Sequence, residues 1–187
     1  FLSSAFCSGP AILLLLAFLL KRLTGFDAGK EAIQTLAKII AYAMGINVFF
    51  YCLEVFTAFY SQIPGHMHPM VALFSGHDGH SLWVNAWMWT AVVLGLVSLL
   101  LIAMPSTRDN EKILPFTLII LVAATWIDKG LGLLIGGFTP NSFEQITVYS
   151  PSIAELAIGI GVYGIGALVL SLLWKIALDV KHEAGTF

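Results

Sequence analysis

The sequence predicts an all-α integral membrane protein with five transmembrane helices. Hydrophobic residues make up 58% of the 187 positions and charged residues 11%, and the mean hydropathy is +0.90. A water-soluble domain carries roughly 25% charged residues, so a soluble fold is excluded. Five apolar stretches reach the length of about 20 residues that crosses a bilayer as a helix, and a period-two alternation typical of β-barrels is missing.

The five predicted spans follow from the apolar stretches in chain order. Gly9-Pro10 lies inside the first and is expected to bend it, because proline removes a helix donor. We interpret residues 1–187 as one helical bundle that belongs to a longer polypeptide. The spans cover about residues 1–20, 37–60, 82–104, 113–135 and 153–176.

The distribution of the nine Lys and Arg residues predicts the orientation. Eight of them lie in or beside the first and third loops or after the fifth span, whereas loops 61–81 and 136–152 contain none. Cytoplasmic loops carry the excess of Lys and Arg. We therefore expect an inner-membrane protein whose loops 61–81 and 136–152 lie outside and whose C-terminus is cytoplasmic. The near-neutral net charge of −2 gives no indication of nucleic-acid binding.

The charged residues inside the apolar segments all lie toward the outer end of their segments. They are Glu54, Asp128, Lys129 and Glu155. A charge at the centre of a bilayer costs about 2.5–3.5 kcal/mol on insertion scales. Their shared position indicates a polar pocket near one membrane face.

Glu54 is expected roughly 9 Å below the outer end of its helix, because it precedes Tyr60 by six residues. Thr57 follows at i+3 and can share its face. An acid there can carry a proton or donate a hydrogen bond to a ligand carbonyl. A protonated Glu54 bonded to a neighbouring helix is an equal alternative.

Asp128 and Lys129 are adjacent near the outer end of the fourth span, beside Trp126. Neighbouring residues point about 100° apart on an α-helix, so both are not expected to face one partner. One of them can pair with Glu54 or Glu155 while the other faces a cavity. An ion pair that only locks helices together is the competing interpretation.

Glu155 has a sufficient local explanation. Ser152 and Glu155 have the Ser-x-x-Glu spacing of a capping box, which would begin the fifth helix.

Four of the five histidines lie in the second loop: His66, His68, His77 and His80. Histidine exchanges protons near neutral pH, so this cluster can relay protons between a membrane acid and the outer aqueous phase. A zinc site is permitted but not required by the spacing. Packing against a partner subunit is the favoured interpretation for at least two of them. No predicted span contains a histidine, which disfavours haem.

Several short motifs resemble one known group. They are Ser-Ser-Ala-Phe-Cys-Ser-Gly-Pro-Ala at residues 3–11, Glu54-Val-Phe-Thr-Ala-Phe-Tyr60, Trp126-Ile-Asp-Lys-Gly130 with Gly136-Gly-Phe-Thr-Pro140, and Tyr149-Ser-Pro-Ser-Ile-Ala-Glu155. They are similar to the NrfD/polysulfide-reductase membrane subunit family, and nearest to the quinone-reactive subunits of the DsrP and Hmc type in sulfate-reducer redox complexes.

The resemblance implies the C-terminal half of a membrane subunit with two helical bundles and without its own haem, iron–sulfur cluster or other metal. Such subunits exchange electrons between menaquinone or menaquinol and a peripheral iron–sulfur protein on the outer face. Other membrane and cytochrome subunits would complete the complex.

The leading hypothesis is therefore a menaquinone-reactive subunit of a respiratory redox complex. Glu54, Asp128 and Lys129 would handle protons, and the loop histidines would relay them. Thr57, Tyr60 and Trp126 would contact the quinone. A proton- or ion-translocating subunit without redox chemistry and a structural membrane anchor are the alternatives.

Overall fold

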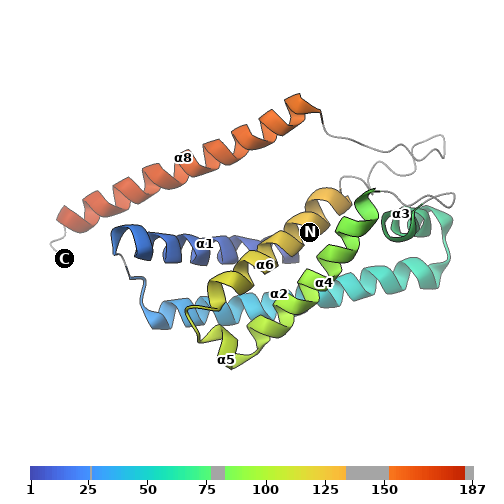
Figure 1. Cartoon of the computed structure of the whole chain (residues 1–187), viewed down its shortest axis with the longest axis horizontal. Coiled ribbons are helices and arrows are strands. Elements are labelled where there is room, and N and C mark those ends of the chain that lie inside the picture. Colours follow the sequence, from blue (N-terminus) through green and yellow to red (C-terminus); the bar gives the residue numbers. More distant parts are fainter. Residues whose placement is uncertain (26, 77–82, 134–151, 184–187) are drawn as a thin grey trace. The chain divides into compact units, whose positions relative to one another are not determined.

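The computed structural model describes residues 1–25, 27–76, 83–133 and 152–183 and divides into two compact units, residues 1–148 and 149–187. Within the described ranges the regular structure is helical, as the composition predicts. Five helices are long and apolar enough to cross a membrane. The predicted fold class is confirmed (Figure 1).

The first unit contains four of the five long apolar segments. Helix α1 packs on α2 and α6, while α4 packs on α6 and α2. Their buried faces form one apolar core in which Ile40, Met44, Ile102, Leu118 and Leu121 are at most 2% exposed. The elements are α1 (Leu2–Thr24), α2 (Lys30–Ser61), α3 (Pro64–Ser75), α4 (Trp83–Ala103), α5 (Pro105–Arg108), α6 (Leu114–Trp126) and the π-helical turn η1 (Ile127–Gly132).

The second loop differs from the expectation, because it contains the helix α3. Pro64 occupies the first turn of α3, where its missing N–H costs nothing. The buried Asn85 amide on α4 donates to the carbonyls of Ala72 and Leu73 at 2.8 and 2.7 Å. These bonds satisfy carbonyls at the C-terminal end of α3 and hold that end against α4.

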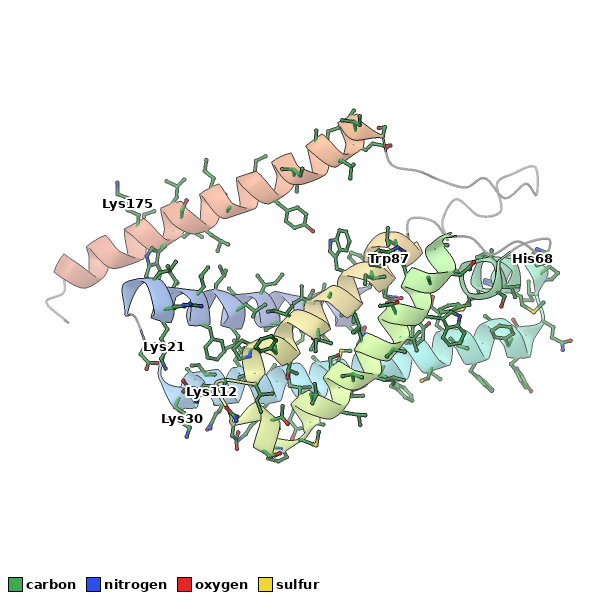
Figure 2. All side chains as sticks on the ribbon, in the orientation of Figure 1. Lys21, Lys30, His68, Trp87, Lys112 and Lys175 are labelled. Carbon is green, nitrogen blue, oxygen red and sulfur yellow. The ribbon has the colours of Figure 1, made fainter. Side chains whose placement is uncertain are left out.

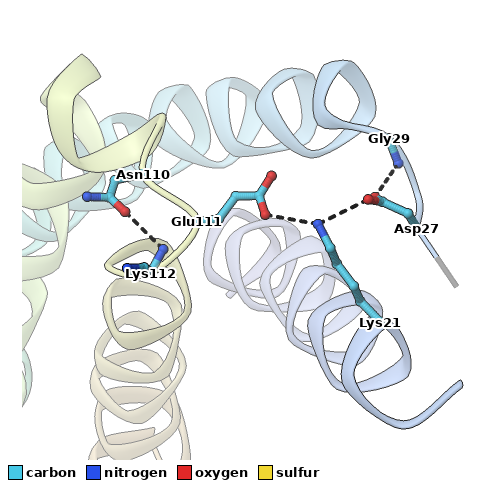
Figure 3. Close-up of polar contacts among 6 residues, drawn as sticks. All are labelled: Lys21, Asp27, Gly29, Asn110, Glu111 and Lys112. Atoms are coloured by element: carbon cyan, nitrogen blue, oxygen red, sulfur yellow. Dashed lines mark hydrogen bonds and ion pairs between the residues drawn. The ribbon is translucent and has the colours of Figure 1, made fainter. Parts of the chain in front are cut away.

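The opposite end of the first unit carries a cluster of charges. Lys21 Nζ lies 2.9 Å from Glu111 Oε2 and 3.1 Å from Asp27 Oδ2, and so joins the α1–α2 connection to the α5–α6 connection (Figure 3). The hydrogen bond from the Gly29 N–H, with that from Lys21, holds the pKa of Asp27 below its ordinary value. Figure 2 shows Lys21, Lys30 and Lys112 near this end of the unit, away from His68 and Trp87.

The second unit contains α8 (Ile153–Glu183), and its start confirms the predicted capping box. The Ser152 N–H donates to Glu155 Oε2 at 2.6 Å, and the Glu155 N–H donates to Ser152 Oγ at 3.3 Å. The two bonds satisfy backbone donors at both sides of the first turn.

Candidate functional site

A cavity of about 560 Å³ lies where α2, α3, α4 and η1 meet, at the end of the first unit away from Lys21, Lys30 and Lys112. Its apolar wall includes Met70, Leu73, Phe74, Met88 and Leu133. Its polar lining comes from the side chains of Tyr51, Glu54, Thr57, Ser61, His66, Asp128 and Lys129. The cavity therefore combines a largely aliphatic wall with charged groups, the combination typical of small-molecule sites.

The π-helical turn η1 supplies two of the charged groups. The fourth span is regular α-helix to Trp126 and then continues with π-type bonding over Ile127–Gly132. π-turns are rare and occur frequently at functional sites. Asp128 and Lys129 both line the cavity, so Lys129, the residue that contacts Glu54, faces the cavity as well.

Lys129 connects the two carboxylates. Its Nζ lies 3.1 Å from Asp128 Oδ2 and 3.9 Å from Glu54 Oε2. The Asp128 and Lys129 side chains are 18% and 21% exposed, whereas that of Glu54 is 59% exposed. The close pair is thus formed within η1, and the longer contact with Glu54 links η1 to α2.

Thr57 lies beside these charges on α2 and lines the same cavity. Its hydroxyl donates to backbone carbonyls of its own helix, Leu53 at 2.8 Å and Glu54 at 3.0 Å. The hydroxyl hydrogen is used in these bonds, but the hydroxyl oxygen can still accept a hydrogen bond from a ligand.

The structure describes two of the four loop histidines, and they differ in position. His66 lines the cavity from the first turns of α3. His68 lies on the same helix but is not among the lining residues. His77 and His80 lie outside the described residues. Nowhere in the described ranges do three His, Cys, Asp or Glu side chains gather as metal ligands would.

Tyr60 and Trp126, the other predicted quinone contacts, are not brought to the cavity lining. Tyr60 is 78% exposed and stacks on Phe56 with ring centroids 5.2 Å apart. Trp126 is 55% exposed at the end of α6 and packs beside Gly130. Neither side chain lines the cavity that contains Lys129.

Tyr51 and Met88 are lining residues that sequence reasoning did not single out. Tyr51 precedes Glu54 by three residues, and this i, i+3 spacing was available as a signal for a shared helix face. Met88 is 3% exposed, and it approaches η1 closely. A Cβ added at Gly132 would lie 2.9 Å from Met88 Cε, so the glycine is what permits this contact.

A known protein aligns with most of this chain. It comes from Halobacterium salinarum and is provisionally named as the membrane component of a dimethyl sulfoxide reductase. The identity is 26% over 194 aligned residues, which cover 91% of this chain and 42% of the relative. The chain thus spans less than half of the relative's length. No family model matches the sequence.

Proposed function

We propose that this chain is a membrane subunit of a redox complex and that it exchanges electrons between menaquinone or menaquinol and an iron–sulfur partner. The observation that carries the proposal is the meeting of Glu54, Asp128 and Lys129 at one cavity, on segments that are otherwise apolar. The name of the relative supports a role in a membrane-bound reductase. The resemblance to quinone-reactive subunits adds the substrate class.

The cavity suits a quinone ring in size and chemistry. Its volume of about 560 Å³ falls within the range of roughly 300–1,000 Å³ found for small-molecule sites. The aromatic side chains of Tyr51 and Phe74 offer flat apolar surface for a ring. Lys129 Nζ and the hydroxyl of Tyr51 can donate hydrogen bonds to carbonyl oxygens.

The carboxylates account for the protons of the proposed reaction. Oxidation of one quinol releases two protons and two electrons. Glu54 and Asp128 supply acceptor oxygens, and Lys129, within ion-pair distance of both, offsets one negative charge. His66 lines the same cavity and can pass a proton onward to the aqueous phase. The electrons would leave to an iron–sulfur cluster held by a peripheral protein.

The proposed orientation follows the charges. The end of the first unit that carries Lys21, Lys30 and Lys112 would face the cytoplasm, which leaves the cavity near the outer face of the inner membrane (Figure 2). The iron–sulfur partner would then dock from outside. Further membrane and cytochrome subunits would surround the apolar helix faces within the lipid bilayer.

The replacement Glu54→Gln tests the role of the acid. We expect quinol turnover by the assembled complex to fall severalfold, because the amide keeps the shape but does not accept a proton from the quinol. Glu31→Gln is the matched control, since Glu31 is in the first turn of the same helix, far from the cavity. Turnover of Glu54→Gln equal to that of the control would contradict the proposed role, provided that the complex assembles.

Binding of a quinone analogue separates this function from the two alternatives. We expect the purified complex to bind a menaquinone analogue at a single saturable site that Glu54→Gln weakens. An ion-translocating subunit without redox chemistry, or a structural anchor, would show no such site. Ion flux into proteoliposomes without quinone turnover would favour the former.

A further inference from the structure

A second, smaller cavity lies next to the one that contains the charged groups. Its volume is about 150 Å³, and it lies between α2, α4 and α6. Most of its wall is apolar, with Met44 and Val48 from α2 and Val92 and Leu96 from α4. Gly95 contributes open space, because a Cβ there would meet only Met44 Cε at 3.9 Å.

The two cavities share part of their walls. Tyr51, Met88 and Asp128 line both. Met88 is unbranched and flexible, so its terminal methyl group can move aside at low cost even though the side chain is buried. A molecule held beside Asp128 in the larger cavity therefore has a short route into the smaller one.

Two polar side chains of the smaller cavity are engaged in hydrogen bonds within the bundle. The Thr125 hydroxyl donates to the carbonyls of Leu121 and Val122, both at 3.0 Å. Asn47 Oδ1 accepts a hydrogen bond from the Ser3 hydroxyl at 3.1 Å. A water molecule needs two to four polar partners, and the wall formed by Met44, Val48, Val92 and Leu96 offers none, so this part of the cavity favours an apolar occupant.

We infer that the smaller cavity binds the first part of the isoprenoid chain of the quinone whose ring occupies the larger cavity. This inference rests on the proposed function and extends it to the side chain of the substrate. An apolar cavity of about 150 Å³ holds a group the size of benzene. One branched five-carbon isoprene unit is of that order, so the first unit fits and the rest of the chain continues toward lipid.

The replacement Gly95→Leu fills the smaller cavity and leaves the charged groups in place. The test compares a ring-only menaquinol analogue with one that carries a short isoprenoid chain, using the whole complex in membranes. For the chain-bearing quinol we expect the half-saturating concentration to rise about tenfold, the size of an overpacking cost. For the ring-only quinol we expect little change, because its site remains open.

Gly45→Leu is the matched control. Gly45 lies inside α2 in the same unit, has nothing within 4 Å of an added Cβ, and lines neither cavity. The control should leave the half-saturating concentration of both quinols unchanged. Val92→Phe is a second way to fill the cavity from α4, and it serves if Gly95→Leu does not assemble.

The possible outcomes are distinct. A rise in the half-saturating concentration of the chain-bearing quinol alone supports the inference. If the half-saturating concentration rises equally for both quinols, or for neither, the inference is overturned. The proposed function still stands in that case, provided that the wild-type complex oxidises quinol. If the wild-type complex neither oxidises nor binds either quinol, the proposed function fails and the inference fails with it.

Discussion

Lys129 is the residue that holds the candidate site together electrostatically. It contacts Asp128 within its own turn and Glu54 on another helix. Among the nine Lys and Arg residues it alone departs from the pattern that predicts the orientation of the chain. A cation in an apolar segment is costly unless it is paired, and here two carboxylates compensate it.

Lys129→Met is expected to destabilise the assembled protein by up to about 3 kcal/mol, because it strands the partly buried carboxylate of Asp128 without a cation. The double replacement Lys129→Met with Asp128→Asn should recover at least half of that loss, since the stranded charge is removed. Thermal unfolding of the purified complex measures both effects.

Lys112→Met is the control for this pair, because Lys112 is exposed at the other end of the first unit. If Lys129→Met unfolds at the same temperature as the control, or if the double replacement recovers nothing, the ion pair does not stabilise the fold.

At the scale of the element, the π-turn η1 carries two of the charged side chains that line the cavity, Asp128 and Lys129. It contains two glycines with different surroundings. A Cβ at Gly132 would lie 2.9 Å from Met88 Cε and 3.2 Å from Met88 Sδ, whereas a Cβ at Gly130 would meet the Trp126 ring at 3.8 Å. The former contact requires a shift, and the latter is ordinary van der Waals packing.

Gly132→Ala should therefore displace Met88 toward the cavities. We expect weaker binding of a quinone analogue, because the wall shared by the two cavities moves, and only a small stability cost, because the end of the Met88 side chain is flexible. Gly130→Ala, in the same turn, should change neither quantity to a comparable extent. Equal binding by the two variants would show that the Met88 contact has no influence on the site.

The element boundaries show why hydropathy predicts membrane spans more accurately than it predicts the ends of helices. Helix α2 begins at Lys30 rather than near residue 37, because charged residues at a membrane surface lower hydropathy without interrupting a helix. Helix α3 has 12 residues and contains Pro69, so it is too short for a spanning signal. A π-turn changes hydrogen bonding without changing composition, and nothing in the sequence predicted η1.

Part of the candidate site could be predicted from the sequence in the same way, from composition. Glu54, Asp128 and Lys129 could be singled out because charges in apolar segments are anomalous. Met88 could not be, because a methionine in an apolar helix is ordinary and its role depends on a contact made across the bundle. That these side chains handle protons or bind a quinone stays a prediction.

At the scale of the whole molecule, the charge pattern of the first unit predicts its orientation. Gly65→Cys and Lys112→Cys place thiols near its two ends, at an open position on α3 and at an exposed position before α6. In a Cys52→Ala background, a membrane-impermeant maleimide should label Gly65→Cys in intact cells. It should label Lys112→Cys only after permeabilisation. The reverse pattern would place the cavity at the cytoplasmic face.

The length of α2 has a consequence for how deep Glu54 lies. Glu54 follows Lys30 by 24 positions on a continuous helix, which is roughly 36 Å along its axis at 1.5 Å per residue. The hydrocarbon core is about 30 Å thick, and transmembrane helices tilt by about 20° on average. With Lys30 at one headgroup layer, an upright α2 would carry Glu54 into the opposite layer, and each degree of tilt draws it back toward hydrocarbon. Bilayer thickness and helix tilt thus set the dielectric surroundings of the acid.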